Sequence, residues 1–210
     1  MTRIVAGSAK GRTLAVPKSG TRPTSERVRE ALFSRLDHMN VLDGATVLDL
    51  FAGTGALGLE ALSRGAARAT LVEKASAAAR VASANVRATG LPARVVTADV
   101  RAYLGARGGE ALTGENDLVF IDPPYDIPEG DMTTVLSALA PWVGPDSLIV
   151  VERSTRAPAP TWPPFLVLED TRAWGETVAY FAGPPLPKDE ESSDAAERAA
   201  ASPVREETAP

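Results

Sequence analysis

Between residues 45 and 154 the sequence alternates short apolar runs with stretches that have helical spacing. Strands that lack a polar face need cover on both sides, which is typical of a parallel sheet between two layers of helices. The predicted strands are residues 45–51, 67–73, 93–99, 118–121 and 147–154, and the predicted helices are residues 55–65, 75–89, 100–106 and 132–143. The pattern therefore predicts an α/β fold built on a mostly parallel sheet.

Two further segments flank this alternation. Residues 3–17 hold two short β-like runs around a turn rich in Gly, Ser and Lys, which predicts a small hairpin. Thr24 or Ser25 is a suitable N-cap for a helix that extends to about His38. After a proline-rich stretch, residues 166–183 predict two strands joined by a short turn. An antiparallel hairpin at one edge would complete a seven-stranded sheet.

Charge is segregated along the chain. The net charge of the chain is −5. Residues 1–40 hold eight Lys and Arg and three acidic residues, whereas residues 184–210 hold three Lys and Arg and seven acidic residues. We therefore divide the chain into a basic hairpin and helix extension (1–40), a main domain (41–183) and a disordered acidic tail (184–210). The basic extension is expected to meet a polyanion. The arginines expected to bind phosphates are Arg22, Arg27 and Arg29.

The composition excludes several classes of site. The chain has no cysteine and one histidine, His38, so neither a disulfide framework nor a transition-metal site is expected. No apolar run approaches the roughly 20 residues of a membrane span. A cytoplasmic protein that needs no metal and no membrane is the expectation.

A glycine loop follows the first predicted strand. Gly53, Gly55 and Gly58 fit the pattern G-x-G-x-x-G at the start of a helix, and Glu73 ends the next strand about twenty residues later, where an acid can bind ribose hydroxyls. The glycines and Glu73 alone leave a nicotinamide-dependent oxidoreductase open. Asp49, just before the loop, argues against it because a carboxylate there would repel a pyrophosphate. It suits instead the ammonium and sulfonium groups of S-adenosylmethionine.

The stretch "IDPPYD" follows the fourth predicted strand, and ligands of open α/β sheets bind beyond the carboxyl ends of the strands. The exocyclic amine of a nucleobase is a poor nucleophile because its lone pair is delocalised. If the Asp122 carboxylate and the Pro123 carbonyl accept its hydrogens, the nitrogen becomes pyramidal and can attack. Pro123 and Pro124 restrict the backbone that carries these acceptors. Tyr125 offers a face on which an unpaired base can stack.

The chain resembles the RsmD family of small-subunit rRNA methyltransferases. The resemblance extends from about Arg3 to Ala182 and covers "GR.L.VP", "RPTSERVREALF", "LDLFAGTGALGLEALSRGA", "FIDPPY" and "VAY". The element "RPT..RVRE.LF" is the most specific, because glycine loops and D-P-P-Y occur in many amino-methyltransferases. The acidic tail matches no motif of the family.

The resemblance implies a class I S-adenosylmethionine-dependent methyltransferase with a Rossmann-like fold. It implies methylation of the exocyclic N2 of a guanine, at position 966 of 16S rRNA, within a small-subunit particle and by a monomeric enzyme. The region from Thr24 to Arg29 would close over the methionine end, Asp99 would lie near the adenine, and Asp122 to Tyr125 would hold the base. The residues implied around the rest of the cofactor are Asp49, Phe51, Gly53, Gly55 and Glu73.

Other classes of function stay open at this stage. D-P-P-Y chemistry also suits methylation of DNA adenine or cytosine amines, although such enzymes usually add a target-reading domain for which this chain lacks room. A protein-glutamine methyltransferase would carry Asn in place of Asp122. An NAD-dependent oxidoreductase would need a proton relay that the sequence does not reveal. A non-catalytic RNA-binding module would not need both Asp49 and Glu73.

Overall fold

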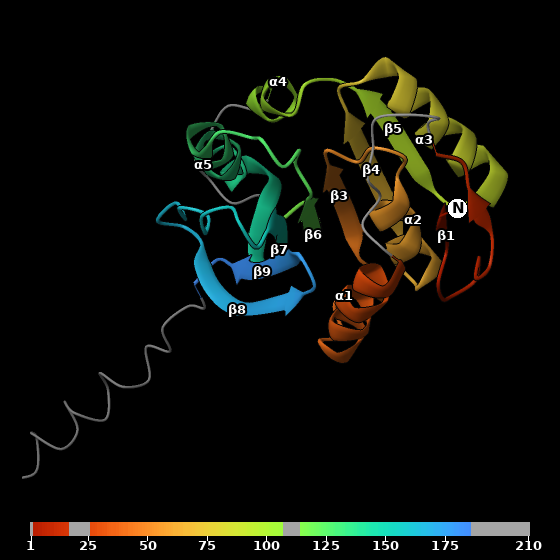
Figure 1. Ribbon diagram of the computed structural model, residues 1–210, viewed down its shortest axis with the longest axis horizontal. Helices are drawn as coiled ribbons and strands as arrows, with labels where there is room; N and C mark the ends of the chain where they lie inside the picture. The colour runs from red at the N-terminus through yellow and green to blue at the C-terminus, as the bar shows by residue number, and fades with distance from the viewer. Residues whose placement is uncertain (1, 17–25, 107–113, 186–210) are drawn as a thin grey trace, which may run out of the picture.

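A seven-stranded sheet runs through the centre of the protein in the order β5-β4-β3-β6-β7-β9-β8 (Figure 1). The computed structural model describes residues 2–16, 26–106 and 114–185. The pairs among β3 to β7 are all parallel, whereas β9 pairs antiparallel with both β7 and β8. The strands are β3 (Thr46–Leu50), β4 (Arg68–Glu73), β5 (Ala93–Thr97), β6 (Asn116–Ile121), β7 (Val143–Ser154), β8 (Val167–Trp174) and β9 (Thr177–Gly183). The predicted parallel sheet with an antiparallel edge hairpin is confirmed.

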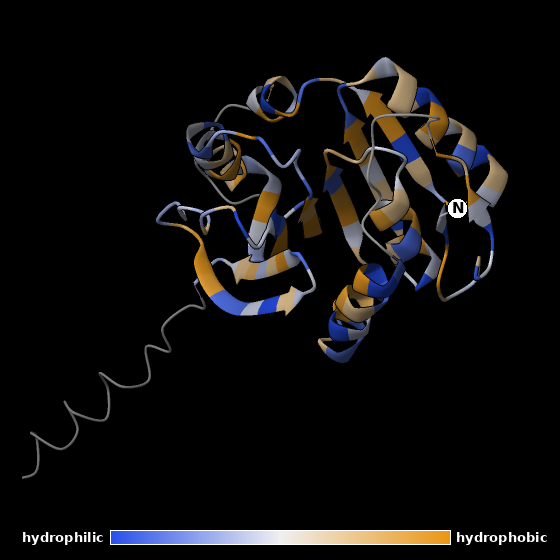
Figure 2. Cartoon of the chain, viewed as in Figure 1, coloured by the Kyte–Doolittle hydropathy of each residue, from blue (hydrophilic) through white to orange (hydrophobic). Residues whose placement is uncertain are grey.

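Helices cover both faces of the sheet. The helices are α1 (Glu26–His38), α2 (Ala56–Ser63), α3 (Ser76–Thr89), α4 (Val100–Gly105) and α5 (Glu129–Ser137). α1, α2 and α3 pack on one face, and α4 and α5 pack on the other, so the apolar side chains form two clusters. Along β7, Leu148 and Val150 enter the first cluster while Ile149 and Val151 enter the second. The central strands are accordingly apolar, and the helices are polar on their outer faces (Figure 2).

The helix predicted for residues 132–143 has different bounds. α5 starts at Glu129 and ends at Ser137, and a separate 3-10 turn, η1 (Ala140–Trp142), leads into β7. Pro128 forms the N-cap of α5, and the acidic residues of its first turn suit the positive end of the helix dipole. Pro141 cannot donate an amide hydrogen, so the chain tightens into one short turn there.

The predicted N-terminal hairpin is present and lies against the main domain. β1 (Thr2–Arg3) and β2 (Thr13–Leu14) form an antiparallel pair. After β2, the amide of Ala15 donates to the Asn85 side chain of α3, and that side chain donates back to the Ala15 carbonyl. The hairpin is therefore hydrogen-bonded to α3. In the described part of the chain, no helix is long and apolar enough to cross a membrane.

Candidate active site

Asp49 lies near the carboxyl end of β3, the strand between β4 and β6. Its side chain is buried, with an exposed fraction of 1% for the residue. Oδ2 accepts the amide hydrogen of Gly58 at 2.9 Å, whereas Oδ1 has no hydrogen-bond partner among the described residues. Burial raises the pKa of Asp49 to about 7, and the negative charges of Asp122 and Glu73 add to the rise. The site therefore holds a carboxylate that a bound cation would stabilise.

The loop after β3 bends sharply into α2. Phe51 has a φ of 61°, a left-handed conformation that is rare for a bulky side chain. Gly55 forms the N-cap of α2 with a φ of 79°. A Cβ on Gly58 would lie 2.3 Å from Leu71 Cδ2 and 3.2 Å from Asp49 Oδ2. The third glycine of the motif is thus required for the close approach of α2 to the strands.

Glu73 at the end of β4 fixes the glycine loop. Its Oε2 accepts from the amide of Gly53 at 2.8 Å, and its Oε1 accepts from the amide of Ala75 at 2.6 Å. Each carboxylate oxygen has two lone pairs, so ribose hydroxyls can donate to the same group. Glu73 therefore combines two tasks, because it orders the loop and still offers acceptors to a ligand.

Asp99 follows β5 and begins α4. Its Oδ1 accepts from the amides of Arg101 and Ala102 at 3.0 and 3.4 Å, which caps the helix. The Lys74 ammonium donates to Oδ2 at 3.0 Å, and this bond is the main reason why the pKa of Asp99 lies below its usual value. Asp99 and Lys74 thus form a charged rim on this side of the site.

A cavity of about 990 Å³ lies over the carboxyl ends of these strands. Its volume is at the upper end of the range for small-molecule sites, so it can hold a nucleoside that carries an amino-acid chain. Most of the predicted cofactor residues line it, and it extends to the predicted base-binding motif. The predicted residues on its wall are Asp49, Phe51, Gly53, Glu73, Asp99, Asp122, Pro123, Pro124 and Tyr125. Gly55 is buried behind this wall.

The base-binding motif follows β6 at the same end of the sheet. Asp122 lies close enough to Asp49 to raise its pKa, so the two carboxylates share one electrostatic environment. Pro123 is buried, whereas Tyr125 has an exposed fraction of 63%. An exposed aromatic ring beside a carboxylate offers a stacking surface to a base that arrives from solvent. A second, smaller hollow next to the motif is lined by residues from the ends of β7 and β9.

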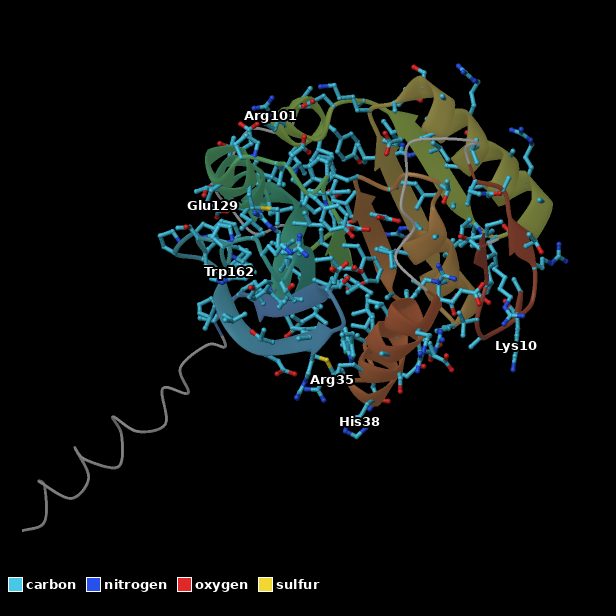
Figure 3. The ribbon with its side chains drawn as sticks, in the orientation of Figure 1. Lys10, Arg35, His38, Arg101, Glu129 and Trp162 are labelled. Carbon is cyan, nitrogen blue, oxygen red and sulfur yellow. The ribbon has the colours of Figure 1, made fainter. Side chains whose placement is uncertain are left out.

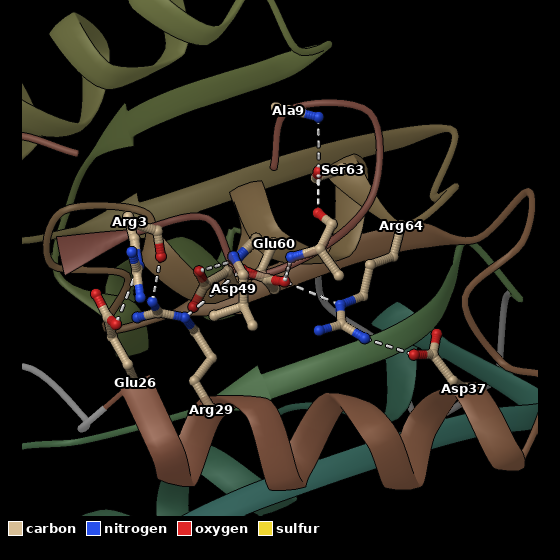
Figure 4. Close-up of polar contacts among 12 residues, drawn as sticks. Arg3, Ala9, Glu26, Arg29, Asp37, Asp49, Glu60, Ser63 and Arg64 are labelled. Atoms are coloured by element: carbon tan, nitrogen blue, oxygen red, sulfur yellow. Dashed lines mark hydrogen bonds and ion pairs between the residues drawn. The ribbon is translucent and has the colours of Figure 1, made fainter. Parts of the chain in front are cut away.

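Arg29 of α1 also lines the cofactor cavity. Figure 4 shows its side chain with its polar contacts. Its exposed fraction is 1%, its Nη2 donates to the Arg3 carbonyl at 2.5 Å, and its Nε lies 3.7 Å from Glu60 Oε2. Burial lowers the pKa of Arg29, although nearby carboxylates, first that of Glu60, oppose this effect. The expectation that Arg29 binds RNA phosphates is wrong, because its side chain is buried in the protein.

Glu60 of α2 connects three segments in this region (Figure 4). Its carboxylate accepts from the amides of Val5 and Ala6 at 2.8 and 3.0 Å and from Arg64 Nε at 2.9 Å. Sequence reasoning missed this buried acid. The signal was there, since Glu60 is the one acidic residue of the apolar helix sequence "ALGLEALS". A lone acid in such a helix indicates a buried ion pair.

Asp49 and Arg29, which both line the cavity, have incompletely bonded side-chain atoms. Asp49 Oδ1 is an acceptor without a partner, and Arg29 Nε and Nη1 are donors without a hydrogen-bond partner, among the described residues. A zwitterionic amino acid has the complementary groups, an ammonium and a carboxylate. The methionine end of S-adenosylmethionine therefore fits these residues, and the acceptors of Glu73 fit its ribose.

Some predicted residues lie elsewhere. Thr24 and Arg22 fall outside the described residues. His38 is exposed at the end of α1 and points away from the molecule (Figure 3). Among the described residues, no group of three or more His, Asp or Glu side chains is placed to hold a metal ion.

Known proteins with similar sequences and structures place this geometry in a family. The family model described as "Conserved hypothetical protein 95" matches residues 2–183. Ribosomal RNA small subunit methyltransferase D of Escherichia coli is 39% identical over 180 residues, which cover 85% of this chain and 87% of that protein. The solved structure of yhhF from Escherichia coli has a TM-score of 0.75 at 35% identity and covers 89% of this chain and 99% of that one.

A hypothetical protein from Thermus thermophilus has a TM-score of 0.73, also at 35% identity, with 86% of this chain and 98% of that chain covered. The predicted methyltransferase fold is confirmed, and the likenesses support S-adenosylmethionine as the cofactor. Because the matched region includes the N-terminal hairpin, α1 and the entire sheet, the likeness extends beyond a shared cofactor fold. The chain belongs to the RsmD family.

Proposed function

We propose that the protein is an S-adenosylmethionine-dependent rRNA methyltransferase, and that its target is the exocyclic N2 of guanine 966 in 16S rRNA. One observation carries this proposal. Asp49 and Arg29 each have buried side-chain atoms without a hydrogen-bond partner among the described residues, and both residues line the cavity that extends to the amine-binding motif of Asp122 and Tyr125. The name of the Escherichia coli relative supports rRNA as the substrate.

The cofactor is held by residues from four segments. Asp49 accepts the ammonium, and Arg29 donates to the carboxylate of the methionine end. Glu73 accepts from the ribose, while Asp99 with its α4 helix borders the adenine. Phe51 and Gly53 form the loop beneath the cofactor, Gly55 supports this loop as the cap of α2, and Thr24 is proposed to close over the methionine end.

The chemical step needs an oriented amine and little else from the protein. The cofactor supplies a methyl group on a positively charged sulfur. Asp122 and the Pro123 carbonyl accept the two hydrogens of the guanine N2 amine, and Tyr125 stacks on the base. With the cofactor bound, the oriented nitrogen would be placed to accept its methyl group. The methylated nitrogen would then pass its proton to Asp122 or to water, so Asp122 need not act as a strong base.

The substrate is proposed to be 16S rRNA within a small-subunit particle, modified in the cytoplasm by a monomeric enzyme. An unpaired guanine must reach Asp122, and the exposed Tyr125 is where it would first contact the protein. Methylation of DNA amines uses similar chemistry, so DNA is the natural competitor substrate for a direct comparison.

A gene deletion tests the proposal. We expect 16S rRNA from deleted cells to lack N2-methylation of one guanine and to regain it when the gene is restored, as mapped by mass spectrometry. The purified protein should methylate small-subunit particles with labelled S-adenosylmethionine and should leave single-stranded and duplex DNA unmodified. Unchanged rRNA methylation in the deleted cells, together with activity on DNA, would overturn the assignment.

A further inference from the structure

The second hollow lies beside the amine-binding motif, and both are built on neighbouring strands. Asp122 to Tyr125 form one side of it, and Glu152, Arg153 and Ser154 of β7 with Thr177 of β9 form the other. β6 and β7 are parallel, with Ile121 opposite Val151. Asp122 and Glu152 are the next residues on each strand, so their side chains leave the sheet side by side on the same face.

Glu152 lies on the face of β7 whose other side chains belong to the apolar core. Leu148 and Val150 precede it on the same face and are buried in the first apolar cluster. Glu152 is itself only 4% exposed. Its carboxylate is near enough to Arg29 to stabilise the charge of that guanidinium. A carboxylate is expensive to bury, so its presence at the strand end indicates a use there.

A hydrogen-bond donor borders the same hollow. Arg153 is next to Glu152 on β7, so its side chain starts from the opposite face of the sheet. Its Nη2 lies 3.4 Å from Glu129 Oε2, and its Nη1 is buried without a hydrogen-bond partner among the described residues. The hollow thus has the Asp122 carboxylate on one side, and Glu152 together with the incompletely bonded donor of Arg153 on the other.

The Watson–Crick edges of the bases differ in a way that this arrangement can distinguish. Guanine presents two donors side by side, N2–H and N1–H, followed by the O6 acceptor. Adenine and cytosine present an amine donor next to an unprotonated ring nitrogen, which a carboxylate would repel. Two adjacent carboxylates therefore match guanine and reject the other two amines.

We propose that Glu152 is the residue that selects guanine, by accepting the N1–H hydrogen while Asp122 accepts from N2. This inference rests on the proposed function, since it assumes that the N2 amine is the methyl acceptor. Arg153 Nη1 is the matching donor for O6. Glu152 acts on recognition of the ring edge and not on the methyl transfer itself, so its removal should change the choice of base more than the use of cofactor.

The test uses RNA in which the target guanine is replaced by 2-aminopurine. This base keeps the amine that receives the methyl group, but its N1 is an acceptor and it lacks O6. We expect the full-length wild-type enzyme to prefer guanine over 2-aminopurine by about tenfold or more in kcat/KM, the range of one good base contact. Glu152→Gln should reduce that preference by about threefold or more, because an amide can also donate to N1, while the contact to O6 stays in place. Its affinity for S-adenosylmethionine should stay near the wild-type value in calorimetry, because Glu60 is the main carboxylate that offsets the burial of Arg29.

Asp146→Asn is the matched control, since it removes an exposed carboxylate from the other end of the same strand, and it should keep the wild-type ratio of the two substrates. Equal kcat/KM of the wild-type enzyme for guanine and 2-aminopurine would overturn the inference, and this comparison holds even if Glu152→Gln does not fold. A Glu152→Gln variant that binds cofactor and keeps the full preference would overturn it as well. If the wild-type enzyme forms no N2-methylguanosine on any RNA, the proposed function itself fails.

Discussion

Asp49 carries a buried carboxylate that must be charged to hold a cation, yet burial raises its pKa from 3.8 to about 7. The folded protein thus retains a proton that the unfolded chain releases between these two values. Raising the pH through this window lowers the stability of the cofactor-free protein, and the loss is complete above about pH 7.

We expect Asp49→Asn to be more stable than the wild type at about pH 8 without cofactor, by up to about 4 kcal/mol, and nearly equal to it below about pH 4. Urea denaturation at both pH values measures this difference. The variant should also bind S-adenosylmethionine more weakly at high pH, because the ammonium loses its charged partner. A stability difference that is the same at both pH values would contradict the assignment of the effect to Asp49 ionisation.

Asp122 is expected to act on the reaction more than on cofactor binding. Asp122→Ala removes the acceptor that orients the amine, so turnover should fall by about a hundredfold or more. Affinity for S-adenosylmethionine, measured by calorimetry, should stay near the wild-type value. Asp146→Ala is a suitable control, since Asp146 is exposed near the other end of β7 and should leave both quantities unchanged. Loss of cofactor affinity with unchanged turnover would remove Asp122 from its proposed role.

Among the elements, α2 is packed so close to the sheet that a side chain at position 58 would displace its neighbours. An added methyl would collide with Leu71 and press on Asp49. We expect Gly58→Ala to lower the free energy of unfolding by about 1 to 3 kcal/mol and to weaken cofactor binding. Gly130→Ala in α5 is the opposite case, because its Cβ would meet no atom within 4 Å outside the helix backbone, and it should stabilise by about 0.5 to 1 kcal/mol. Thermal unfolding of both variants measures these changes in stability. Equal changes for the two variants would contradict the close packing of α2 on the sheet.

The elements that sequence predicts well are those with a local signature. The strands of the parallel sheet are recognisable because they are apolar on both faces. The glycine loop and the motif at residue 122 each follow such a strand directly, so the sequence predicts that they lie together at the carboxyl edge of the sheet. The contact of Arg29 with Glu60 could not be predicted in this way, because it joins two helices 31 positions apart in the sequence. Arginine is usually an exposed residue, although Arg29 lies on the face of α1 that also carries the buried Leu32 and Leu36. The start of α5 was likewise missed, since only the turn at Pro128 determines it.

Across the whole molecule, the basic residues of the N-terminal region stand against an otherwise acidic chain. Arg27 is exposed on α1, whereas Arg35 on the same helix lies 3.1 Å from Asp170. We expect rRNA affinity to fall steeply with salt, and Arg27→Ala to reduce the log–log slope by about one, as the loss of one phosphate contact does. Arg35→Ala should leave the slope unchanged. If Arg27→Ala keeps the wild-type slope across the salt series, rRNA is bound elsewhere.

The antiparallel hairpin that ends the sheet also bears on how the protein behaves at high concentration. Among the described strands, β8 pairs with β9 alone and forms the edge of the sheet, and Val167 and Leu168 of β8 are exposed. An edge of this kind can recruit a strand from another molecule and start aggregation. The register shifts between Leu168 and Asp170, which indicates a bulge, and charged side chains follow it. Bulge and charges together hinder edge-to-edge pairing, so replacement of Asp170 and Arg172 by β-branched apolar residues would convert this edge into a site of fibre growth.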